Sequence, residues 1–125
     1  MRRLSALSVL LVATVLVACA TLPPAKPVQD LRTIAGKWEG TFTAPFGTFP
    51  YALTIKEDGS WEGLAPTSPF PKSEGTMAAR DGKVRSVSKT TGITYTITLH
   101  EGEGQRILSG RSEDGSVTFR LTPAK

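Results

Sequence analysis

The chain has 125 residues, 39% of them hydrophobic, and a formal net charge of +4 at pH 7. From Gly36 onward it carries eleven basic and ten acidic residues with the signs interspersed, a net charge of +1. The length therefore allows one small domain, and the charge pattern offers no basic run for nucleic acid. Cys19 is the only cysteine, which excludes an internal disulfide.

The first eighteen residues are typical of an export signal. Arg2 and Arg3 precede an uncharged stretch of fifteen residues, Leu4 to Ala18, that is rich in Leu, Val and Ala. This length suits the apolar part of a signal peptide and falls short of the ~20 residues that a membrane-spanning helix needs. We therefore expect a cleaved signal peptide over residues 1–18.

The segment Leu16-Val17-Ala18-Cys19 resembles the lipobox of bacterial lipoproteins. The resemblance implies cleavage before Cys19, a diacylglycerol on its thiol, and an N-acyl chain such as palmitate on the new amine. Ala20 stands where an aspartate tends to retain such proteins in the inner membrane, so we expect a lipid-anchored protein of the outer membrane that faces the periplasm. Two alternatives remain: an ordinary cleavage site that releases a soluble secreted protein, and an uncleaved signal anchor.

Residues 19–35 are expected to link the anchor to the domain. The stretch from Thr21 to Ile34 holds three prolines and few apolar residues. This composition predicts an extended spacer of ~3.1 Å per residue that lifts the domain off the lipid surface. Leu31 to Ile34 is predicted to form a helical turn against the domain.

Residues 36–125 show the two-residue period of β-strands. Eight strands are predicted, over residues 37–43, 49–56, 60–65, 74–80, 83–89, 93–99, 105–112 and 116–122. Three Asp-Gly pairs mark tight hairpin turns, and no run of ten residues has a helical period. We predict an all-β domain, an eight-stranded antiparallel meander that forms a small barrel or half-barrel. In strand 83–89, Val84 and Val87 are out of phase, which suggests a bulge or an irregular edge.

Gly36-Lys37-Trp38 at the start of the first strand resembles the G-x-W motif of lipocalins and related calycin barrels. Residues 108–121 resemble the closing hairpin of small bacterial lipocalin-like domains. The resemblance implies a barrel that takes a small apolar ligand. It also implies an arginine of the last strand, Arg120, packed on Trp38.

The predicted inward side chains decide whether the barrel has room for a ligand. They include two tryptophans, two tyrosines, two phenylalanines and Val87, so we expect an interior filled by side chains. The inward glycines, Gly40, Gly63 and Gly110, are expected to let each strand coil around a large neighbour. The alternative is a ligand cavity with four aromatic walls: Trp38, Tyr51, Trp61 and Tyr95.

Counting strands from the anchor assigns the loops to two ends. The turns at 58–59, 81–82 and 102–104 should face the membrane, with the longer loops at the opposite end. Two of those distal loops carry prolines and an aromatic residue near the tip, Phe46 and Phe70. Each ring is either a contact site for a partner or a plug for the barrel end.

The sequence carries no recognisable catalytic or metal-binding pattern. His100 is the only histidine and is expected to be a solvated surface residue, so no zinc site is expected. The adjacent acids Glu57-Asp58 and Glu113-Asp114 belong to hairpin turns, where aspartate has a backbone role. We expect neither an enzyme nor a metal, and no cofactor besides the lipid on Cys19.

Three functions are compatible with this reading. The leading hypothesis is a non-catalytic outer-membrane lipoprotein whose barrel is an interaction module acting through its distal loops. The second is a carrier of a small hydrophobic ligand inside the barrel. The third is a hydrolase inhibitor that inserts a distal loop such as 67–72.

Overall fold

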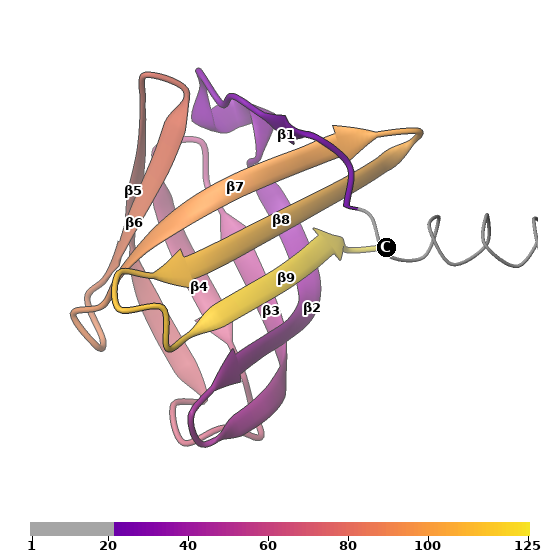
Figure 1. The fold of residues 1–125 in the computed structure, drawn as a ribbon. Coiled ribbons are helices and arrows are strands. Elements are labelled where there is room, and N and C mark those ends of the chain that lie inside the picture. Colours follow the sequence, from indigo (N-terminus) through magenta and orange to yellow (C-terminus); the bar gives the residue numbers. More distant parts are fainter. Residues whose placement is uncertain (1–21) are drawn as a thin grey trace, which may run out of the picture.

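The computed structural model describes residues 22–125 (Figure 1). The predicted signal peptide and Cys19 lie outside these residues. Eight long strands form the body of the domain: β2 (Gly36–Ala44), β3 (Gly47–Ile55), β4 (Ser60–Leu64), β5 (Lys72–Arg80), β6 (Lys83–Ser88), β7 (Thr94–Gly102), β8 (Gln105–Ser112) and β9 (Thr118–Pro123). All eight predicted strands are therefore present, with ends that differ by a few residues.

These strands form a closed barrel. From β2 to β9, each strand pairs antiparallel with the next one in the chain, and β9 pairs back with β2. Closure removes the free edges that a meander would otherwise expose to other chains. The predicted all-β antiparallel meander is confirmed.

Asp-Gly turns connect several of the strands. The carboxylate of Asp58 accepts hydrogen bonds from the backbone and the hydroxyl of Ser60, at 2.9 and 2.7 Å. Asp114 does the same for Ser116, at 3.0 and 2.8 Å. Gly59 has a φ of +94°, which glycine adopts without a steric penalty. The backbone role predicted for the turn aspartates is confirmed.

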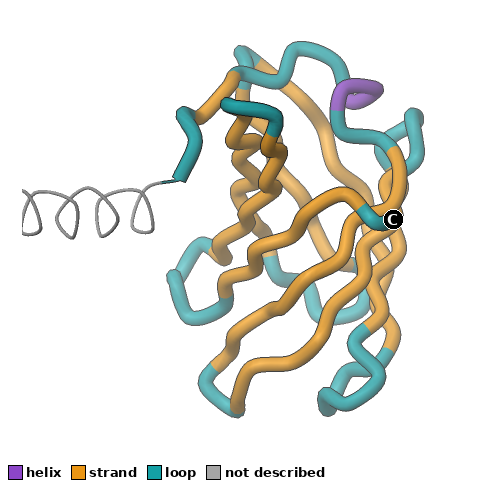
Figure 2. The backbone as a smooth tube through the Cα atoms, turned by 90° about the vertical axis from the view of Figure 1, so that its right-hand side faces the viewer, coloured by secondary structure: helices purple, strands orange, loops and turns teal. Residues whose placement is uncertain are grey.

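The segment before β2 closes one end of the barrel. A short strand, β1 (Ala25–Lys26), pairs with β7, and the backbone N–H of Val28 donates to the Gly82 carbonyl at 2.9 Å. A 3-10 turn, η1 (Leu31–Thr33), follows; it is the purple turn in Figure 2. Val28 and Ile34 are 2% and 0% exposed. The predicted helical turn is confirmed, but the extended spacer is wrong for this segment, because its apolar side chains complete the core.

Trp38 anchors this closed end. Its indole N–H donates to the Ile34 carbonyl at 2.8 Å, and the Arg106 guanidinium lies 5.3 Å from the ring centroid. Arg106 also donates to the Thr33 carbonyl at 2.6 Å. Arg120, which was expected to pack on Trp38, is exposed. The prediction was therefore wrong about the strand, because the arginine that contacts Trp38 is Arg106 of β8. Its hydrogen bond to the Thr33 carbonyl connects the N-terminal segment to the barrel.

Candidate functional site

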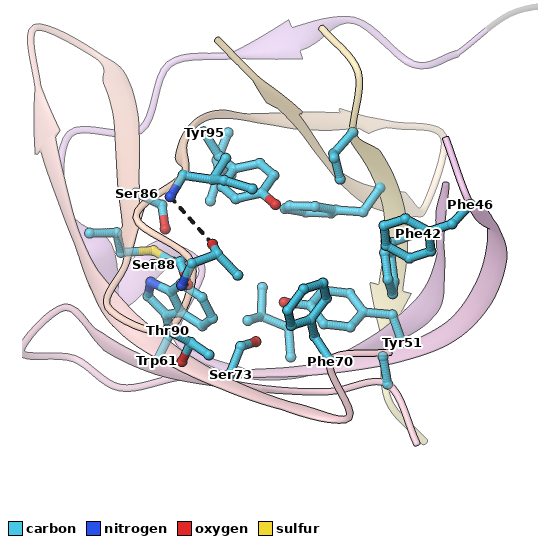
Figure 3. Close-up of a pocket in the computed structure, with 18 residues that line it drawn as sticks. Phe42, Phe46, Tyr51, Trp61, Phe70, Ser73, Ser86, Ser88, Thr90 and Tyr95 are labelled. Atoms are coloured by element: carbon cyan, nitrogen blue, oxygen red, sulfur yellow. Dashed lines mark hydrogen bonds between the residues drawn. The ribbon is translucent and has the colours of Figure 1, made fainter. Parts of the chain in front are cut away.

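A cavity of about 480 Å³ lies inside the barrel, towards the end opposite the N-terminal segment (Figure 3). Its volume falls in the ~300–1,000 Å³ range of ligand pockets. The expectation of an interior filled by side chains is therefore wrong. Most of the lining side chains are aliphatic or aromatic, and they come from strands on all sides of the barrel as well as from the distal loops.

Strand β6 explains part of the empty space. Val84, Ser86 and Ser88 point inward and are 0%, 2% and 3% exposed, whereas Val87 is 44% exposed. The strand pairs with β5 and β7 in regular register, so the predicted bulge and the inward Val87 are both wrong. Small serines occupy positions where the hydrophobic pattern suggested large side chains, and this leaves room for the pocket.

The inward glycines make space for aromatic rings. A Cβ atom at Gly63 would collide with the Tyr51 ring, and one at Gly110 would collide with Phe119. Both glycines therefore accommodate large neighbours, as predicted, but the ring belongs to another strand. At Gly40 an added Cβ would meet the backbone of β9 instead.

Aromatic side chains form a continuous wall from the mouth to the interior. Phe46 and Phe70 meet at the mouth with centroids 6.3 Å apart. Deeper in the pocket, the Tyr51 ring lies 5.5 Å from Phe42 and 5.8 Å from Phe119. In such pairs the rings contribute contact energy beyond their buried area. This wall provides a large apolar surface that a ligand can cover.

Hydroxyl side chains gather on another part of the lining, formed by β5, β6 and the loop after β6. We call these residues the hydroxyl wall: Ser73, Ser86, Ser88, Thr90 and Thr91. In Figure 3 most of them lie across the cavity from Phe42 and Phe46. The pocket therefore has a polar side, formed by the hydroxyl wall, and an apolar aromatic side that faces it.

The lining carries no ionised side chain. Among the described residues that line the pocket there is no Asp, Glu, Lys, Arg or His. Two phenols are present, and burial raises the pKa of both Tyr51 and Tyr95 above the usual value. Both phenols therefore stay protonated at neutral pH, and the pocket is electrically neutral.

Five of the six aromatic residues singled out in the sequence meet at this pocket: Phe46, Tyr51, Trp61, Phe70 and Tyr95. Trp38 does not, since it is buried at the closed end. The serines of the hydroxyl wall were missed. The only signal for Ser86 and Ser88 in the sequence was the broken alternation of strand 83–89.

Phe46 and Phe70 combine the two roles considered for them. They are 50% and 51% exposed, yet both line the pocket. The loop that carries Phe70 is held by a hydrogen bond from the Ala65 N–H to the Pro71 carbonyl, at 2.9 Å. Within the loop, the Ser68 N–H and hydroxyl donate to the Ala65 carbonyl, at 3.0 and 2.9 Å, and the Phe70 N–H donates to the Ser68 hydroxyl, at 3.1 Å. Phe70 therefore stands at the mouth on a loop held by hydrogen bonds, and Phe46 meets it there from the turn between β2 and β3.

His100 is not the solvated surface residue that was expected. It is partly buried, with Nδ1 3.1 Å from the Pro23 carbonyl and Nε2 3.1 Å from the Ser109 hydroxyl. Over residues 22–125, no three His, Cys, Asp or Glu side chains cluster in a way that could hold a metal ion. In the same part of the chain, no helix has the length and apolar character needed to cross a membrane.

Comparisons of the chain with protein-family models, with curated proteins and with solved structures found no match.

Proposed function

We propose that this protein binds one small hydrophobic molecule inside its barrel and acts as a carrier for it. The observation that supports the proposal is the 480 Å³ cavity with its predominantly apolar lining. Ligand pockets are typically concave, mostly apolar and already formed before the ligand arrives. The closed meander and the internal pocket also support the proposed relation to lipocalins.

The pocket changes the order of the functional hypotheses. A barrel that acts only through its distal loops has no need of an internal cavity, whereas a carrier requires one. Phe46 and Phe70 still offer half-exposed rings at the mouth, which supports a role in passing the ligand to a partner. The hydrolase-inhibitor hypothesis gains no comparable support.

We further propose that the carrier is a lipoprotein of the outer membrane, held by the acylated Cys19. Two bonds tie this segment to β7: His100 Nδ1 lies 3.1 Å from the Pro23 carbonyl, and the Glu101 N–H donates to the Pro24 carbonyl at 3.0 Å. Pro23 is four residues after Cys19 in the chain, and four extended residues span at most about 14 Å. Such an anchor would hold the closed end near the lipid and turn the pocket mouth away from it.

Ligand binding can be tested with N-phenyl-1-naphthylamine, an uncharged dye whose fluorescence rises in apolar surroundings. We expect saturable binding of about one dye per chain. Ser86→Phe should fill the pocket and abolish the signal, whereas Val87→Phe, on the outer face of the same strand, should leave it unchanged. Thermal melting must show that both variants are folded. Equal dye binding by the two folded variants would contradict an internal site.

The anchor is tested separately by metabolic labelling with radioactive palmitate. The wild-type chain should take up the label and sediment with outer membranes, and Cys19→Ala should do neither. An unlabelled wild-type chain in the soluble periplasmic fraction would contradict the anchor and leave the pocket proposal untouched.

A further inference from the structure

We infer that the ligand is an uncharged amphiphile, with an apolar body and a hydrogen-bond acceptor such as an ester or carbonyl group that meets the hydroxyl wall. The inference rests on the proposed function, because it concerns the occupant of the same pocket. Three features of the lining carry it: its neutrality, the hydrogen bonds that its hydroxyls already make, and the position of the aromatic wall.

The neutrality of the lining argues against an ionised ligand. A carboxylate moved out of water into an apolar site loses its hydration, and the loss is large unless a cation or several donors replace it. The hydroxyl groups of the lining are uncharged donors, and the described lining supplies no Lys, Arg or His to balance the charge of a fatty-acid carboxylate. An ester, an alcohol or a ketone of the same length meets no such penalty.

The hydroxyl wall is arranged to donate hydrogen bonds. The Ser88 hydroxyl oxygen accepts the Thr91 N–H at 3.1 Å, and the Thr90 oxygen accepts the Glu74 N–H at 3.1 Å. The Thr91 oxygen likewise accepts the Ile93 N–H at 3.3 Å. Each of these oxygens already receives one backbone donor, so one of its two lone pairs is used while the hydroxyl hydrogen remains available to donate to a ligand. An acceptor on the ligand is the matching partner.

Ser86 extends this wall into the interior. Its side chain lines the pocket although the residue is only 2% exposed. A pocket for a pure hydrocarbon would gain more from alanine or valine there, because covering a hydroxyl group with an apolar ligand removes its hydration without replacing it. The aromatic rings on the other side of the cavity supply the apolar surface for the rest of the molecule (Figure 3).

The test uses the full-length protein and two ligands that share a ten-carbon acyl chain. Methyl decanoate is uncharged and accepts hydrogen bonds, whereas decanoate is an anion near pH 7. Each competes with N-phenyl-1-naphthylamine, and its dissociation constant is read from the loss of dye fluorescence. We expect methyl decanoate to bind at least about tenfold more tightly than decanoate. Equal or tighter binding of decanoate would overturn the inference about charge.

A variant tests the hydroxyl contribution. Ser86→Ala should weaken binding of methyl decanoate by roughly three- to tenfold more than it changes binding of the dye. Val87→Ala, on the outer face, is the matched control and should change neither. If Ser86→Ala weakens both ligands equally, its hydroxyl has a structural role and the inference about the acceptor fails. If neither the dye nor either decanoyl compound binds the wild-type protein, the proposed function itself fails, and this outcome is distinct from the other two.

Discussion

The two tryptophans are both buried, but only the indole N–H of Trp38 has a hydrogen-bond partner. The same substitution should therefore have different effects on the free energy of unfolding at the two positions. The Trp38 N–H donates to a carbonyl of Ile34, a residue that is 0% exposed. Trp61 is 5% exposed, and its indole N–H has no hydrogen-bond partner among the described residues. Replacing either tryptophan by phenylalanine removes the same atoms. At Trp38 the loss of the hydrogen bond lowers the free energy of unfolding, whereas at Trp61 the loss of a donor that had no partner raises it.

Trp38→Phe leaves a buried carbonyl without its donor, which costs about 1–3 kcal/mol. The smaller ring also leaves a cavity and weakens the contact with Arg106, which at exposed sites is worth ~0.5–1 kcal/mol. We expect a total loss of about 2–4 kcal/mol. Trp61→Phe loses a similar apolar area but removes an unsatisfied donor, so we expect a loss of about 0–1 kcal/mol.

The measurement is urea unfolding of both variants followed by circular dichroism, which does not depend on the tryptophan that has been removed. The expected difference of about 2 kcal/mol corresponds to roughly 10 °C in melting temperature for a domain of this size. The m-values should be equal, since both variants expose nearly the same surface on unfolding. If Trp61→Phe destabilises the protein as much as Trp38→Phe, the reasoning from the hydrogen bonds is refuted.

Four further predictions concern the pocket and the turns. The affinity for N-phenyl-1-naphthylamine should stay constant between about pH 5 and 9, because the lining has no group that titrates in this range and the pKa values of Tyr51 and Tyr95 are raised. A sigmoidal dependence of the affinity on pH would contradict a neutral lining. Phe70→Ala should speed both uptake and release of the dye in stopped-flow experiments, since the ring meets Phe46 at the mouth; unchanged rates would remove Phe70 from the entry path. Gly110→Ala should destabilise the fold by about 1–3 kcal/mol in urea unfolding, because its Cβ collides with the Phe119 ring; a neutral effect would mean that the ring moves freely. Hydrogen bonds from Ser116 and Ser112 lower the Asp114 pKa to about 2, so the charged carboxylate stabilises the fold above about pH 4, and this stabilisation is lost as the pH falls towards 2. Asp114→Asn should therefore lower the urea midpoint at pH 7 but not at pH 2. A difference in midpoint between the two proteins that persists at pH 2 would contradict this prediction.

Much of the fold follows from local patterns. Alternating hydrophobic residues and Asp-Gly turns predicted all eight strands of the barrel, because side chains in a strand alternate between faces and tight turns require particular residues. The same patterns placed the aromatic residues of the pocket on the inner face. Phe46 and Phe70 were singled out because an aromatic residue exposed in a loop marks a contact site.

The pocket was harder to predict because its volume depends on how strands far apart in the sequence pack. In β6, the inward positions hold Ser86 and Ser88 while Val87 faces outward, which breaks the hydrophobic pattern. The break was taken for a bulge, a feature of the backbone. It instead marks the hydroxyl wall, and departures from a local pattern are expected where a site is built.

The sequence by itself determined the strands, the turns and the order in which the meander runs, since these depend on neighbours within a few residues. Tertiary structure alone decided that the N-terminal segment covers one end of the barrel, that Arg106 rather than Arg120 packs on Trp38, and that the other end stays hollow. These features arise from contacts between residues distant along the chain, where side-chain size and direction on opposing strands decide whether space is filled.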